Sequence, residues 1–194
     1  MKDIEIEIKL KLEEPEKLMQ WLEENASFVN EEHQIDRYFD PPEKSFILKN
    51  KFDGSKDADE WFRIRATKKG NEICYKKWHR DENGKSLYAD EIETSIGDEE
   101  TTLKILQSLG FKETSLIDKT RKSYRYKDFQ FDCDDAKGIG FFVEIEFKGS
   151  IEDPTKGREM ILDFLKEIGV ANWKKTKRGM PWLQWNPDAE HYED

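Results

Sequence analysis

The sequence predicts an α+β fold in which about three helices pack on a mainly antiparallel sheet of about eight strands. Two observations carry this prediction. Apolar and charged residues alternate along much of the 194-residue chain, and a period of two is typical of a half-buried strand. The segments are joined largely by hairpin-type connections, which link antiparallel neighbours. This pattern fits both an open sheet and a sheet closed into a barrel.

The first strand is expected at 4–12, where alternation is strictest. Its apolar face consists of Ile4, Ile6, Ile8, Leu10 and Leu12, and its charged face consists of Glu5, Glu7, Lys9 and Lys11. A helix is expected at 15–25, because Pro15 suits a first helical turn and apolar residues then recur at helical spacing.

Seven further strands are expected at 33–40, 60–68, 71–79, 85–95, 115–127, 129–135 and 140–148. Asn83-Gly84 is a strong hairpin turn signal. The segment 41–59 is interpreted as a loop, with room for a short strand at 45–48.

Two more helices follow from capping signals. Asp98 begins one, Gly110 ends it, and its apolar stripe is Leu103, Leu106 and Leu109. Asp153-Pro154 begins the other and Gly169 ends it, with Met160, Ile161, Phe164, Leu165 and Ile168 on its apolar face. The domain is expected to span 1–170, and 171–194 to form a tail on or near the barrel end. The tryptophans of the tail favour packing there over RNA binding.

The composition limits the classes of function. Charged residues make up 39%, aromatic residues 12%, and the net charge is −10. The aromatic content favours a folded chain, and the acidic balance argues against nucleic-acid binding, although a local cationic cluster or bound metal can still hold a polyanion. Cys74 and Cys133 are interpreted as free thiols in a reducing cytosol. The acidic N-terminus lacks signal-peptide character and no 18-residue apolar run exists, so a cytoplasmic location and no membrane association are expected.

Paired charges on single strand faces need an explanation. Glu-Ile-Glu occurs at 5–7, 91–93 and 144–146, and each pair places two carboxylates about 7 Å apart on one face. A divalent cation is the simplest compensator. Arg63 and Arg65 form the basic counterpart, with Lys76, Lys119 and Arg121 on other strands. Such groups suit phosphate oxygens. The alternative is a sheet with one charged face in water.

The order of these motifs resembles the CYTH family, the triphosphate tunnel metalloenzymes. The matching motifs are Glu5-Ile6-Glu7-Ile8-Lys9, Gln34-x-Asp36-x-Tyr38-Phe39, Phe62-Arg63-Ile64-Arg65, Cys74-Tyr75-Lys76, Asp90-Glu91-Ile92-Glu93, Leu109-Gly110-Phe111, Asp118-Lys119-Thr120-Arg121 and the run from Asp134 to Glu146. The resemblance covers about residues 3–170. It implies a closed eight-stranded antiparallel barrel whose lumen is lined by charged side chains, with the helices packed outside.

The resemblance also implies roles for individual residues. Mg²⁺ or Mn²⁺ would be held by Glu5, Glu7, Glu144 and Glu146, with Asp134 and Glu93 near it. The phosphates would be bound by Lys9, Arg63, Arg65, Lys76, Lys119, Arg121 and Arg178. Lys9, Arg63, Arg65 and Lys76 are the implied catalytic groups. Lys77 and Trp78 depart from the family pattern, which has smaller residues after the strand lysine.

Two reactions fit the implied site. The middle section resembles class IV adenylate cyclases most, which favours conversion of ATP to cyclic AMP and pyrophosphate. The alternative is an inorganic or thiamine triphosphatase, and a third reading is a triphosphate-binding module without catalysis. Family members often pair as dimers, so a homodimer stays open.

Overall fold

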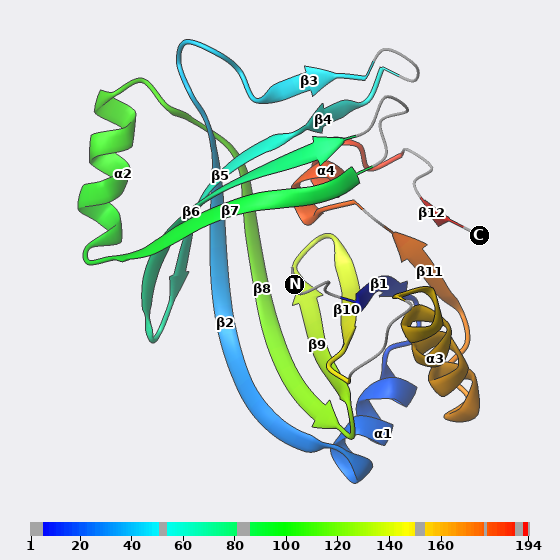
Figure 1. Cartoon of the computed structure of the whole chain (residues 1–194). Helices are drawn as coiled ribbons and strands as arrows, with labels where there is room; N and C mark the ends of the chain where they lie inside the picture. Colours follow the sequence, from blue (N-terminus) through cyan, green and yellow to red (C-terminus); the bar gives the residue numbers. More distant parts are fainter. Residues whose placement is uncertain are drawn as a thin grey trace. The chain divides into compact units, whose positions relative to one another are not determined.

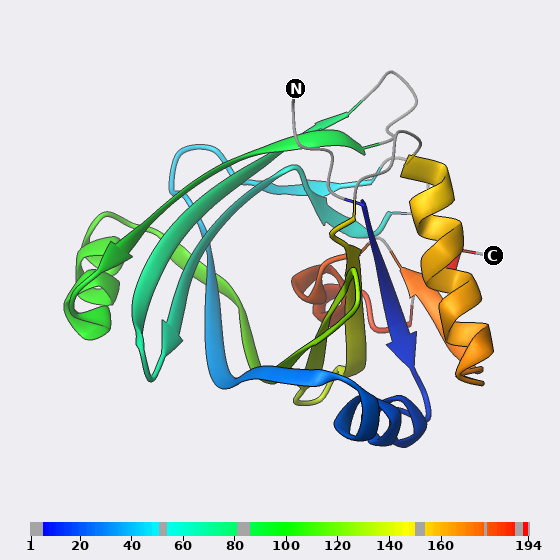
Figure 2. The same cartoon turned by 60° about the horizontal axis from the view of Figure 1, so that its bottom comes forward.

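The computed structural model describes residues 6–50, 54–80, 86–149, 154–176, 178–188 and 192–193. Among them it shows an α+β fold with a ten-stranded sheet, a separate two-stranded ribbon and four helices (Figures 1 and 2). The predicted hairpin turn at 81–84, and Asp153, lie outside the described residues. The chain forms two compact units, which are considered separately below.

The eight expected strands are all present, and the sheet is antiparallel at every described ladder. They are β1 (Ile6–Leu12), β2 (Ser27–Asp40), β5 (Glu60–Thr67), β6 (Gly70–Arg80), β7 (Ser86–Ile96), β8 (Lys112–Tyr126), β9 (Phe129–Ala136) and β10 (Gly140–Phe147). Four shorter strands were not assigned firmly from the sequence: β3 (Ile47–Lys49), β4 (Lys56–Ala58), β11 (Trp173–Thr176) and β12 (Tyr192–Glu193).

The first unit contains residues 1–32, 119–177 and 190–194. Its strands follow the order β12-β11-β1-β10-β9-β8, and α1 (Glu16–Asn25) and α3 (Pro154–Glu167) lie beside β1 in both views (Figures 1 and 2). Alternation buries the apolar face of β1 and leaves its charged residues on the other face. The core that results is made of Ile6, Ile8, Leu10 and Leu12 of β1, Leu18 and Leu22 of α1, Ile161, Phe164 and Leu165 of α3, and apolar residues of β8, β9 and β10. The charged face of the unit is therefore opposite the helices.

The second unit contains residues 33–118 and 178–189. Its strands follow the order β2-β5-β6-β7, and α2 (Glu99–Ser108) covers their apolar face. The core here consists of Phe39, Ile64 and Leu106 with partly buried Phe62, Ile73, Ile96, Leu103 and Phe111. Leu109, expected in the α2 stripe, is instead 61% exposed because the helix has already ended.

Local signals explain where α2 begins and ends. The Asp98 carboxylate accepts a 2.6 Å hydrogen bond from the Thr101 backbone N–H, which satisfies one free donor of the first turn. At the other end Gly110 has φ +85°, and the Phe111 N–H donates to the Leu106 carbonyl. A Cβ at Gly110 would also lie 3.2 Å from Pro42, so glycine suits this turn on both counts.

The C-terminal segment contains an unexpected helix, α4 (Met180–Trp185). Trp182 is 2% exposed, and Trp185 stacks on Trp61 with 5.3 Å between ring centroids. The Asn186 side chain both donates to the Lys56 carbonyl and accepts from the Lys56 N–H, at 2.9 Å each. Residues 178–188 are thus an integral part of the second unit.

Candidate functional site

The first unit presents a charged face formed by β1, β10, β9 and β8. Register places Lys9 opposite Glu144, Glu144 opposite Asp132, and Asp132 opposite Ser123. Directly opposed residues in an antiparallel pair lie close enough for their side chains to interact. The sequence-predicted residues that this face brings together are Glu7, Lys9, Lys119, Arg121, Asp134, Glu144 and Glu146.

Asp134 is the most buried acid of this face, with 1% exposure. Arg121 binds it in a bidentate manner, with Nε donating to Oδ1 and Nη2 to Oδ2, both at 2.7 Å. Lys119 Nζ donates to Oδ2 at 2.8 Å and is itself 5% exposed. The carboxylate is therefore fully occupied by two cations, which it holds in fixed orientations.

Glu144 links this group to β1. Its Oε1 lies 3.0 Å from Lys9 Nζ, and its Oε2 accepts from Arg121 Nη2 at 3.0 Å. Asp132 adds a longer contact to Arg121 at 3.3 Å and accepts a 2.6 Å hydrogen bond from the Ser123 hydroxyl. Three cations and three carboxylates thus form one continuous network.

The network shifts the pKa values of its acids downward. Burial opposes ionisation of Asp134, but the hydrogen bonds and charges of Arg121 and Lys119 outweigh it and lower the carboxyl pKa. Burial also opposes ionisation of Glu144, and the charges of Lys9, Arg121 and Lys119 lower its pKa well below the usual range. Both groups are therefore ionised at neutral pH.

We predict that this network makes the protein sensitive to acid. The ordinary pKa values are 3.8 for Asp134 and 4.5 for Glu144, and both are depressed in the folded state. Their contribution to stability is complete above the unfolded-state values and is lost as pH falls below them. We expect the urea concentration at the midpoint of unfolding to decrease as the pH is lowered from 5 to 3. The decrease should be smaller in Asp134→Asn than in the wild type. An equal midpoint at pH 3.5 and pH 7 would contradict the prediction.

A carboxylate pair lies further along the same face. Glu7 of β1 is exposed and is the cross-strand partner of Glu146 on β10. Lys148 Nζ contacts Glu146 at 2.6 Å. Opposed carboxylates repel unless a cation lies between or beside them, and their hard oxygens suit Mg²⁺ or Mn²⁺. Glu5 lies outside the described residues.

The second unit has a charged face of its own, formed by β2, β5, β6 and β7. The sequence-predicted residues on it are Arg63, Arg65, Lys76 and Glu93. Asp36 on β2 is 2% exposed and binds Arg65 in a bidentate manner, at 2.6 and 2.8 Å. Arg63 donates to Glu72 at 2.9 Å, while its buried Nε has no partner among the described residues. Asp36 therefore matches the role that Asp134 has in the first unit.

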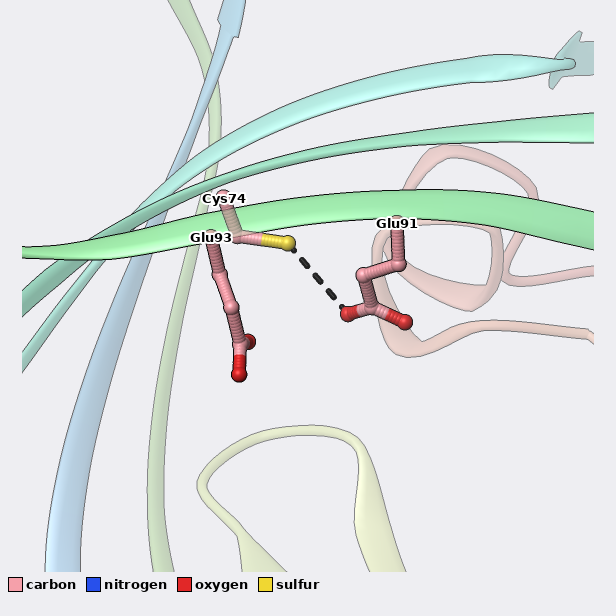
Figure 3. A group of neighbouring side chains, drawn as sticks. All are labelled: Cys74, Glu91 and Glu93. Carbon is pink, nitrogen blue, oxygen red and sulfur yellow. Dashed lines mark hydrogen bonds between the residues drawn. The ribbon is translucent and has the colours of Figure 1, made fainter.

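The next row on this face carries Lys76 and a cysteine with two acids. Lys76 Nζ donates to Glu91 at 2.9 Å. The Cys74 thiol donates to the same carboxylate at 3.3 Å, and Glu93 points into the same space (Figure 3). One ligand atom from each of Cys74, Glu91 and Glu93 lies within 4.8 Å of the others, so the three could hold a metal ion. Burial and the neighbouring carboxylates raise the pKa of Cys74 to about 11 despite the charge of Arg63.

Arg178 also lies in the second unit, but the residues that it contacts are not the charged-face residues named above. Its Nη1 contacts Asp57 on β4 at 2.9 Å, and its guanidinium lies over the Trp182 ring at 4.6 Å. Its placement with the phosphate-binding cations therefore stays a prediction.

Three of the acids that contact the cations are not among the site residues that the sequence predicts. These are Asp36, which the sequence marks only as part of a motif, Asp132 and Glu72. Period-two alternation assigns each of these residues to a face, but cross-strand register decides which cation each one meets. For Asp36 the sequence offers one signal, which is its spacing to Tyr38 and Phe39.

The chain is similar to proteins of one family over nearly its whole length. Residues 3–180 match the CYTH domain family. A Methanocaldococcus jannaschii protein named "Putative adenylate cyclase" is 31% identical over 170 residues, covering 87% of this chain and 91% of the relative. A conserved hypothetical protein from Pyrococcus furiosus has a solved structure with a TM-score of 0.65 and 27% identity, covering 93% of this chain and 99% of that one.

A more distant solved structure shares the fold. It is a Hippeastrum protein described as a "putative adenylyl cyclase" with a dominant triphosphatase activity. The TM-score is 0.65 and the sequence identity is 19%, and the match covers 97% of this chain and 100% of that one. Among the described residues, none of the helices is long and apolar enough to cross a membrane.

Proposed function

Because this chain belongs to the CYTH family, whose members are triphosphate tunnel enzymes, we propose that it converts ATP to cyclic AMP and pyrophosphate in a metal-dependent reaction. The observation that carries the proposal is the pair of charged faces, on which cations are fixed in place by buried carboxylates. The Methanocaldococcus jannaschii relative supports the choice of the cyclase reaction.

The cations divide between two tasks in this proposal. The residues that bind phosphate oxygens are Lys9, Arg63, Arg65, Lys76, Lys119, Arg121 and Arg178. Four of these also stabilise charge in the transition state, namely Lys9, Arg63, Arg65 and Lys76. Arg121 and Arg65 are pre-oriented by bidentate contacts to Asp134 and Asp36. Because these side chains are oriented before the substrate binds, little reorganisation is needed during the reaction.

The carboxylates fit Mg²⁺ or Mn²⁺ through their hard oxygen donors. We propose Glu7 and Glu146 with Glu5 and Glu144 as the residues that would hold the ion, and Asp134 and Glu93 as acids near it. The exposed Glu7 lies opposite the half-buried Glu146, and this pairing of carboxylates supports the choice. When bound, the metal would neutralise phosphate oxygens and polarise the attacked phosphorus.

The proposed step is attack by the ribose 3′-hydroxyl on the α-phosphorus. A bond forms between O3′ and the α-phosphorus, and the hydroxyl proton passes to solvent. The bond between the α-phosphorus and the oxygen that bridges it to the β-phosphorus breaks, and this oxygen leaves with the pyrophosphate. Negative charge then collects on the departing pyrophosphate. Lysine and arginine side chains on the charged faces are the groups that stabilise this charge.

A second candidate is hydrolysis of a terminal phosphate, as in an inorganic or thiamine triphosphatase. The fold shared with the Hippeastrum protein favours keeping it, because that protein is described with a dominant triphosphatase activity. The same cations would serve both reactions, and the phosphorus that meets the nucleophile distinguishes them. We also propose the closed eight-stranded barrel of the family as the architecture, and a homodimer is compatible with it.

A product assay tests the proposal directly. ATP, GTP, thiamine triphosphate and tripolyphosphate are each incubated with the full chain and Mg²⁺ or Mn²⁺, with a chelator as the control. We expect cyclic AMP and pyrophosphate from ATP, and none with the chelator. Phosphate release from thiamine triphosphate or tripolyphosphate without cyclic AMP would establish the second candidate. Tight binding without turnover under every condition would leave a binding module.

A further inference from the structure

Trp78 lies on the charged face of the second unit, next to a proposed phosphate-binding cation. It follows Lys76 by two positions on β6, so both side chains project from the same face. Lys76 Nζ lies 5.2 Å from the centre of the Trp78 ring. The Trp78 backbone N–H donates to the Asp59 carbonyl at 2.7 Å, which fixes the strand at this point.

The neighbours of Trp78 leave part of its ring accessible. The side chain is half-buried, and its cross-strand partner on β7 is Ala89, whose methyl group covers little of an indole. Trp61 on the same face is differently placed, because Trp185 stacks on it and Tyr38 meets it edge-on at 5.7 Å. Both tryptophans are half-buried, and among the described residues Trp78 is the one of the two whose ring no aromatic side chain covers.

Spacing relates this ring to the cations. Two residues along a strand span about 7 Å, so the Trp78 ring is displaced from Lys76 by about that distance along β6. A group attached to a phosphate at Lys76 can reach the ring, whereas a bare polyphosphate has nothing to place there. Stacking on an aromatic side chain is available to any flat base.

We propose that Trp78 is a specificity-determining residue that stacks on the ring of an aromatic triphosphate, of the nucleoside type, and so selects it over tripolyphosphate. This inference rests on the proposed function, because it takes the cations beside Trp78 as the phosphate site. It narrows the substrate class of that site to triphosphates that carry a flat ring.

Three ligands and three variants test the inference. The full-length wild type is compared with Trp78→Leu, Trp78→Phe and the matched control Tyr75→Leu, which removes an aromatic ring from the opposite face of the same strand. Dissociation constants with Mg²⁺ are measured by calorimetry for a non-hydrolysable ATP analogue, for ribose 5-triphosphate and for tripolyphosphate. KM values are measured for whichever ligands are turned over.

Trp78→Leu should weaken binding of the ATP analogue about tenfold and change tripolyphosphate binding less than twofold. Trp78→Phe should restore most of the loss, and Tyr75→Leu should leave the ratio of the two constants unchanged. Equal effects on both ligands, or none, would overturn the inference. If Trp78→Leu does not fold, the test is made on the wild type alone. Equal affinity of the wild type for the ATP analogue and for ribose 5-triphosphate would then overturn the inference. Absence of turnover would refute the proposed function alone, since the binding ratios are read independently.

Discussion

Glu144→Gln should lower turnover of the substrate by about 100-fold while the chain keeps its fold. Glu144 accepts contacts from Lys9 and Arg121, and we propose it as a metal ligand. The amide preserves the shape of the side chain but removes its charge, so it weakens metal binding and the contact to each of the two cations, while Arg121 keeps its bidentate contact to Asp134. Steady-state kinetics, a metal titration and circular dichroism measure the three effects separately.

The control for Glu144→Gln is Asp135→Asn. Asp135 is an exposed acid on β9 beside Asp134 in the sequence, and it projects from the other face of the strand. We expect this variant to keep wild-type kinetics and metal dependence. A Glu144→Gln protein with wild-type kcat would remove Glu144 from the site.

Asp134→Asn should cost about 3–5 kcal/mol of the free energy of unfolding. Asp134 is 1% exposed and accepts three hydrogen bonds from Lys119 and Arg121. The amide cannot neutralise them, so two largely buried cations lose their main counterion. Urea unfolding at pH 7 measures the loss, and KM for the triphosphate should rise because the cations are no longer oriented.

Two comparisons make this result specific. Asp132→Asn removes an acid that is 20% exposed and has a longer contact to Arg121, so it should cost less. Combining Asp134→Asn with Arg121→Gln should cost less than the sum of the two single variants, because the pair is removed together. A loss below about 1 kcal/mol for Asp134→Asn would show that the buried network is not what stabilises the first unit.

The strands that alternate strictly were predictable, and those that lack alternation were not. β1 shows the first case, because its apolar and charged faces are separated without exception. β2 shows the second: it begins at Ser27, six residues before the expected start, and Phe28 and Val29 in this extension are 57% and 56% exposed. Residues whose burial does not alternate carry no period for a sequence analysis to detect.

The C-terminal segment was unpredictable for a different reason. α4 has only six residues, and its place depends on tertiary contacts such as the stack of Trp185 on Trp61 and the bonds of Asn186 to Lys56. Isolated helices this short are unstable in water, so local sequence carries little signal. The site shows the same division, because alternation placed Arg65 on a face while register alone paired it with Asp36.

The raised pKa of Cys74 bears on how the protein tolerates air and oxidants. At neutral pH a thiol with a pKa of about 11 is ionised in about one molecule in ten thousand, and only the thiolate reacts readily with peroxides or alkylating agents. Cys133, which is 1% exposed and whose pKa burial also raises, is shielded in the same way. Burial thus keeps both sulfur atoms mainly in the thiol form, so we expect slow reaction of either cysteine with oxidants and alkylating agents.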